Sequence, residues 1–283
     1  MKVLINLLKF ILTMILTITL ISIGLITILF STVLDKNYIM QKLEETDFYL
    51  GTYQLVESNF ENYIDQSGLD ENVLENICTQ EKVKNDINMI LSNIYNGKNQ
   101  VIDTTEIETN LNANIDKLGI KNNQNEGAIN QFVNHICSEY KNTLIYANYS
   151  TKITGVYQNA VSKLNNVYKI MLGVLVIDFI AIIIVNNKKI LNDVQSLGTA
   201  LLSCGVFEVL ACQIVVAKVK IQGIKVFDDA FSKTLVAIIQ EVLQKISSLA
   251  VGSIIIAILV IAIYAARTIS KKTKENLNTG KEL

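Results

Sequence analysis

The chain has 283 residues, of which 50% are hydrophobic, and its formal net charge of −1 conceals an uneven distribution. Residues 35–166 carry a net charge of −8 and the rest of the chain a net charge of +7. Neither part is charged densely enough to suggest nucleic-acid binding. The hydrophobic residues are bunched, unlike those of a soluble domain. Richness in Asn, Ile and Lys is typical of an AT-rich bacterial genome.

The first predicted element is a transmembrane anchor at residues 1–34. Residues 10–34 form a run of 25 without a charged side chain, and ~20 apolar residues suffice to cross a hydrocarbon core of ~30 Å. Lys2 and Lys9 lie at the start of this run, where a lysine can reach the headgroups. Since a cleaved signal peptide has a shorter apolar region of ~7–15 residues, we expect the anchor to be retained.

Residues 35–166 are polar and numerous enough to form a core of their own. Apolar residues recur there at spacings of three and four, which predicts helix faces. One such face consists of Tyr49, Tyr53, Val56, Phe60 and Tyr63. Gly68 ends that helix, Thr79 precedes the next one, and Thr105 with Glu108 fits a capping box. We therefore predict a bundle of four or five helices.

A second membrane span is predicted at residues 167–185 and a third at residues 197–217. The third is the weakest because it contains Glu208 and Gln213. An apolar stripe opposite a polar face predicts an amphipathic helix at residues 228–248. This helix either lies flat at the membrane interface or packs on the outer bundle.

A fourth span is predicted at residues 249–266, within a membrane domain at 167–266, and a basic tail follows at 267–283. The tail residues expected to face anionic lipids are Arg267, Lys271, Lys272 and Lys274. The expected location is the cell membrane. The lysines near the ends of the spans predict that the N- and C-termini both lie in the cytoplasm. The predicted fold is an all-α polytopic membrane protein with four transmembrane helices and an extracytoplasmic helical bundle between spans 1 and 2. With four spans, the five lysines between the third and fourth spans would lie outside the cytoplasm, against the usual bias. In the alternative the third segment does not cross, which leaves three spans and places the basic tail outside.

Asp178 and Glu208 are the candidate functional residues within the spans. Each lies about a dozen residues into its span, which at ~1.5 Å per residue is close to the middle of the bilayer. An ionised carboxylate costs at least ~2.5–3.5 kcal/mol there, and two neighbouring carboxyl groups can share a proton. The functional hypothesis is a cation or proton site, or a docking point for a basic residue of a partner. The alternative is a pair of protonated acids that form hydrogen bonds within the helix bundle.

The four cysteines fall into two pairs. Cys78 and Cys137 belong to the outer domain, where a disulfide would persist. It would close a loop of about 60 residues and contribute roughly 4 kcal/mol, and the alternative is two reduced thiols in a helical core. Cys204 and Cys212 are expected to pack between helices rather than to bind a ligand. With one histidine, His135, the sequence predicts neither a metal site nor another cofactor.

The sequence has no Walker lysine loop, no zinc-protease motif and no nucleophile elbow, so we predict a non-catalytic protein. Its outer domain is expected to bind a protein or ligand, as an envelope sensor or scaffold. Membrane lipids and a membrane or envelope protein are the expected partners. One span, a large outer domain and three further spans also resemble the topology of ABC permeases that act in mechanotransmission. That resemblance, which is in topology alone, implies the alternative of a permease-type subunit working with a separate ATPase.

Overall fold

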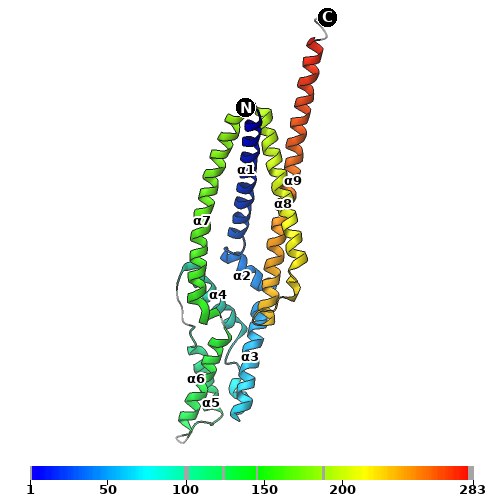
Figure 1. The fold of residues 1–283 in the computed structure, drawn as a ribbon. Coiled ribbons are helices and arrows are strands. Elements are labelled where there is room, and N and C mark those ends of the chain that lie inside the picture. The colour runs from blue at the N-terminus through cyan, green and yellow to red at the C-terminus, as the bar shows by residue number, and fades with distance from the viewer. Residues whose placement is uncertain (1, 99–101, 123–124, 145, 187–188, 280–283) are drawn as a thin grey trace. The chain divides into compact units, whose positions relative to one another are not determined.

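The computed structural model describes residues 2–98, 102–122, 125–144, 146–186 and 189–279, and within these ranges the chain forms helices and no strand (Figure 1). An aspartate or threonine before several of the helices supplies an N-terminal cap. In chain order the helices are α1 (Lys2–Phe30), α2 (Lys36–Glu45), α3 (Phe48–Ser67), the 3-10 helix η1 (Glu71–Leu74), α4 (Gln80–Asn96), α5 (Thr105–Lys117), α6 (Glu126–Thr143), α7 (Tyr146–Val185), α8 (Ile190–Lys218), the 3-10 helix η2 (Ile221–Gly223) and α9 (Asp229–Thr279).

In the described part of the chain, four helical segments are long and apolar enough to cross a membrane. They are Val3–Phe30, Lys152–Val185, Ile190–Gly223 and Asp229–Lys271. Only 11–28% of the most apolar window of each segment is buried within the protein, so most of its large side chains face outward. A water-soluble fold would cover such surface, whereas lipid solvates it. The chain is accordingly a multi-pass membrane protein.

The chain divides into two compact units. The membrane unit comprises Met1–Leu34, Lys163–Ile224 and Ile238–Leu283, and the bundle unit comprises Asp35–Ser162 and Lys225–Ala237. Helices α7 and α9 each belong to both units. The amphipathic helix expected at residues 228–248 is therefore not a separate element, because it is the first part of α9 and continues into the fourth span without interruption.

In the membrane unit, α1 and α8 pack along one another. Leu16 of α1, Ile182 of α7 and Ala200 of α8 are buried together and form a small apolar core. Leucines of the same three helices pack around it, namely Leu12, Leu20, Leu175 and Leu197. This core places the buried face of α7 against α1 and α8, which determines where the acidic residues of the spans lie.

The bundle unit has a larger core of its own, built from one apolar face of each helix. Tyr49, Val56 and Phe60 of α3 are buried as their spacing predicts, while Tyr53 and Tyr63 are partly buried at its edge. The other helices contribute faces with the same three- and four-residue spacing. Their central buried residues are Val83, Ile87, Ile90 and Ile94 of α4, Ile107, Leu111 and Ile115 of α5, and Phe132, Val133, Ile136 and Tyr140 of α6.

Two helix starts show where the sequence predicted the local structure well and where it did not. Thr79 caps α4, because its hydroxyl accepts a hydrogen bond from the backbone N–H of Lys82 at 3.2 Å. The capping box of Thr105 and Glu108 is wrong, because Thr105 already lies within α5. Its N–H and its hydroxyl both donate to the Asp103 carboxylate, at 2.9 and 2.6 Å. An Asp two residues earlier thus takes the capping role.

Candidate functional site

Two acidic residues are buried in the membrane unit, Asp178 on α7 and Glu208 on α8. Only 4% of the surface of Asp178 and 2% of that of Glu208 is exposed. None of the four carboxyl oxygens has a hydrogen-bond partner among the described residues. Buried polar groups almost always have such a partner, and an ionised carboxylate without one is strongly unfavourable. Each acid is therefore a buried polar group without a hydrogen-bond partner among the described apolar helices of the membrane unit.

The structure does not bring these two acids together. Asp178 lies seven residues before the end of α7 at Val185, whereas Glu208 lies eighteen residues after the start of α8 at Ile190. Because the two helices form a hairpin, and a helix rises ~1.5 Å per residue, the two levels differ by roughly 15 Å. A shared proton requires a direct hydrogen bond between the carboxyl groups, and none exists. The structure thus places the two acids at different levels of the hairpin, without a hydrogen bond between them.

Glu208 lies where α8 meets both α1 and α9. A Cβ atom added to Gly24 of α1 would lie 3.7 Å from the Glu208 Oε1 atom and 2.7 Å from a methyl carbon of Leu249. The thiol of Cys204, one helical turn earlier, lies beside the Glu208 carboxyl group but lacks the geometry of a hydrogen bond. Within the described residues no three His, Cys, Asp or Glu side chains converge as a metal site would require. The arrangement suits a neutral acid or a carboxylate compensated by another molecule.

Asp178 faces the same side of α7 as Leu175 and Ile182, both of which pack toward α1 and α8. Three- and four-residue spacings put these positions on one helix face. Asn186 follows at the end of this face and donates a hydrogen bond from its side-chain amide to Asp193 at 2.8 Å. That bond links the end of α7 to the first turn of α8 and orders the hairpin that buries Asp178.

Small residues seven positions apart form the contact of α8 with α9. A Cβ atom on Gly198 would lie 2.9 Å from a side-chain carbon of Ile261, and one on Gly205 would lie 2.6 Å from the carbonyl oxygen of Ala250. One repeat further, the Cys212 thiol lies 3.9 Å from the carbonyl oxygen of Leu243. A seven-residue period keeps one face against a partner helix, and small residues let the backbones approach closely in a bilayer. Cys212 thus has the packing role that the sequence predicted.

The bundle unit contains a buried ion pair that sequence reasoning missed. The Lys82 ammonium group lies 3.2 Å from the Asp86 carboxylate, and their side chains are 10% and 8% exposed. The Tyr140 hydroxyl donates to the same Asp86 oxygen at 2.6 Å, and Lys82 also donates to the backbone carbonyl of Asp103 at 3.2 Å. Burial, and next the hydrogen bond to Asp86, raise the pKa of Tyr140. The four-residue spacing of Lys82 and Asp86 was the available signal.

Cys78 and Cys137 are both buried in the core of the bundle unit, where they are free thiols. Burial raises the pKa of Cys78 to about 12, and burial also raises that of Cys137. Because the thiolate is the reactive species, both residues should be poor nucleophiles in the folded protein. The disulfide between them stays a prediction, since the structure shows two unbonded thiols in the same core.

We expect a thiol reagent to label neither Cys78 nor Cys137 in the folded protein at pH 8. For Cys78 a pKa of about 12 leaves roughly one thiolate in ten thousand, and burial also raises the pKa of Cys137. Unfolding without a reductant should then expose all four cysteines to labelling, as counted by intact-mass spectrometry. A count of two, rising to four after reduction, would instead establish the disulfide. Labelling of the same protein after full reduction provides the control.

The basic tail continues α9, which is helical as far as Thr279. The side chains of Arg267 and Lys271 are exposed. Those of Lys272 and Lys274 lie outside the described residues. An exposed helix that carries positive charge immediately after an apolar span is the usual arrangement at the cytoplasmic face of a membrane. The contact with lipid headgroups predicted for this tail remains a prediction.

Comparisons of the chain with protein-family models, with curated proteins and with solved structures find no match. The function of the chain is therefore inferred from the residues and geometry described above. These define an all-helical, multi-pass membrane protein with a compact bundle unit and two unpartnered acids among its spans.

Proposed function

We propose that this chain is a non-catalytic integral membrane protein whose bundle unit binds a protein or ligand, as an envelope sensor or scaffold. One observation carries the proposal: α7 and α9 are continuous helices of 40 and 51 residues, and each begins in the bundle unit and continues into the membrane unit. Two of the spans are thus extensions of helices that are packed in the bundle. Binding that repacks the bundle would act directly on helices that continue as spans.

The bundle part of α7 is held against the end of α4. The rings of Tyr157 and Tyr95 lie with their centroids 4.5 Å apart. The side-chain amide of Gln158 donates to the backbone carbonyl of Tyr95 at 3.1 Å. Neighbouring Gly97 ends α4 with a positive φ of 70°, a conformation that favours glycine. A bound partner that displaces α4 would therefore also displace α7 through these contacts.

The first turns of α9 are held in the same way against α2 and α3. The hydroxyl groups of Thr46 and Thr234 are hydrogen-bonded at 2.7 Å in a buried position. A Cβ atom on Gly51 would lie 2.7 Å from the Cβ atom of Ala230, so the two backbones approach closely. An exposed ion pair between Asp47 and Lys233 adds little to this packing. The bundle thus holds the start of both long helices through contacts with different elements.

The proposed topology places both termini in the cytoplasm and the bundle unit outside it. Lys9 lies near the start of the first span, before the uncharged run at residues 10–34. Lys189 lies between α7 and α8, and Arg267 and Lys271 follow the apolar segment at residues 249–266. Four crossings put all of these residues on one side, and an excess of Lys and Arg marks the cytoplasmic side. The acidic residues 35–166 then lie outside, which supports a role in the cell envelope.

Affinity purification of the full-length protein from crosslinked membranes, followed by mass spectrometry, tests the proposed function. We expect envelope proteins to be recovered with the intact chain, because the bundle unit supplies the binding surface. A four-span membrane protein expressed at the same level provides the control for bystanders. Recovery of no specific partner, together with unchanged melting when candidate ligands are added, would contradict a sensor or scaffold role.

The second candidate is a permease-type subunit that works with a separate ATPase. The order of elements favours it, because one span precedes the bundle unit and three spans follow. This order is similar in topology to that of ABC permeases that act in mechanotransmission, although a topology alone does not define a function. The same crosslinking experiment separates the two proposals, since a cytoplasmic ATPase among the recovered proteins would favour the permease.

A further inference from the structure

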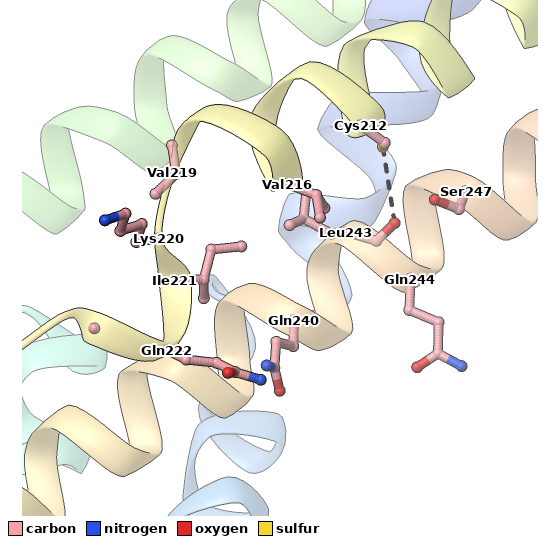
Figure 2. A pocket seen from close by; sticks show the side chains of 11 residues that line it. Cys212, Val216, Val219, Lys220, Ile221, Gln222, Gln240, Leu243, Gln244 and Ser247 are labelled. Carbon is pink, nitrogen blue, oxygen red and sulfur yellow. Dashed lines mark hydrogen bonds between the residues drawn. The ribbon is translucent and has the colours of Figure 1, made fainter.

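A pocket lies in the membrane unit where α8 ends and the chain turns through η2 beside α9 (Figure 2). Its volume is about 720 Å³, within the range of ~300–1,000 Å³ that is usual for small-ligand sites. The neighbouring contact of Cys212 with the backbone of Leu243 holds the two helices together at its edge. The pocket lies at Cys212 and beyond, at a different level of α8 from Glu208, and neither buried acid lines it.

The lining of this pocket combines apolar side chains with amide groups. Val216, Val219 and Ile221 line it from the side of α8 and η2, and Leu243 lines it from α9. The uncharged polar side chains are Gln222, Gln240, Gln244 and Ser247. The last three lie on one face of α9, since they are spaced by four and three residues. None of the three glutamine amides forms a hydrogen bond with another described residue, so all remain free to bind a ligand.

The positions of the lining residues along α8 and α9 place the pocket at the level of the lipid headgroups. Cys212 lies more than twenty residues after Lys189, and Ser247 lies twenty residues before Arg267. Because ~20 helical residues cross a hydrocarbon core of ~30 Å, both counts place the pocket at the boundary opposite these basic residues. A ligand there has access to water at one end and to acyl chains at the other.

The charge of the lining indicates what kind of headgroup fits. Among the described residues that line the pocket, Lys220 is the charged one, and in Figure 2 its ammonium nitrogen points away from the amides of Gln222 and Gln240. A phosphate group is usually bound by a cation that points at it. An amide offers both donors and acceptors, which match hydroxyl groups that also donate and accept. The lining therefore favours an uncharged head that carries several hydroxyl groups.

We propose that this pocket binds a membrane glycolipid. The sugar hydroxyls form hydrogen bonds with the amides of Gln222, Gln240 and Gln244, and the acyl chains lie against Val216 and Leu243. The apolar lining keeps the lipid in the outer part of the hydrocarbon layer, and the amides select the headgroup.

Native mass spectrometry of the full-length protein, released from a detergent that has no sugar group, tests the proposal. Glucosyl-diacylglycerol, phosphatidylglycerol and phosphatidylcholine with identical acyl chains are titrated separately. We expect one bound glucosyl-diacylglycerol with a Kd about tenfold lower than that of either phospholipid. Equal affinity for the three lipids, or tighter binding of phosphatidylglycerol, would overturn the proposal, the latter because it would indicate an anion site.

The variant Q240L/Q244L is expected to lose this preference, since the loss of two hydrogen bonds raises the Kd of the glycolipid about tenfold or more. The matched control is Q195L, on an exposed position of α8 outside the pocket. Q222L, a single change at the third amide, should raise the Kd severalfold and keeps the test decisive if the double variant unfolds. An unchanged preference in both pocket variants overturns the proposal.

Discussion

Gly205→Ala is expected to destabilise the membrane unit by about 1–3 kcal/mol, the usual cost of overpacking a tight contact. The added Cβ atom would lie 2.6 Å from the carbonyl oxygen of Ala250 and 2.6 Å from a side-chain carbon of Ile254. The Ile254 side chain can rotate, but the Ala250 oxygen belongs to the backbone of α9 and moves only with the helix. The change should therefore lower the melting temperature of the detergent-solubilised protein.

Gly252→Ala and Gly173→Ala provide matched controls, because a Cβ atom on either glycine meets no heavy atom within 4 Å. Gly252 lies on α9 only two residues from Ala250, so it tests the same helix at nearly the same level. Alanine favours a helix over glycine by about 1 kcal/mol, and both controls should therefore melt at or above the wild-type temperature. Equal destabilisation at Gly205 and Gly252 would show that close packing of α8 on α9 is not the cause.

The sequence predicts the spans more reliably than the positions within them. The run of residues 10–34 and the three later apolar segments predict four spans, and each lies in a helix of the structure. Asp178 and Glu208 lie at different levels of their helices, whereas the sequence put both near the middle of the bilayer, because their depths were counted from the apolar segments. Helix α8 begins at Ile190, seven residues before its predicted span, since the polar turn that precedes the apolar segment is also helical. That shift separates the two acids by several turns.

The contacts between distant elements explain most of what the sequence did not reveal. The seven-residue spacing of Gly198, Gly205 and Cys212 can be recognised in the sequence, but only the structure shows that these residues pack against α9. The glycolipid pocket likewise depends on the turn at η2, which brings Gln222 to the polar face of α9. Local spacing gives the face of a helix, whereas its partner is determined by the packing of the whole unit.

Asp86→Ala is expected to destabilise the bundle unit more than any surface substitution, by about 3 kcal/mol. Removing one partner of a buried ion pair costs ~3–5 kcal/mol, because the other charge stays buried and uncompensated. The lower end applies here, since Lys82 keeps its bond to the Asp103 carbonyl and a longer contact of 3.8 Å with Glu106. The Tyr140 hydroxyl also loses its acceptor. Hydrogen–deuterium exchange of α4 and α6 in the full-length protein measures the loss.

The cost arises from the groups left without a partner, so removing all three polar groups should restore most of the stability. The triple variant K82M/D86A/Y140F replaces the network by apolar side chains, which is often neutral or stabilising when a buried ion pair is exchanged. Asp116→Ala, at an exposed position of α5, is the control and should change the stability by less than about 0.5 kcal/mol. If the triple variant is as unstable as Asp86→Ala, the network is essential as a whole, and the uncompensated charge is not the reason for the loss.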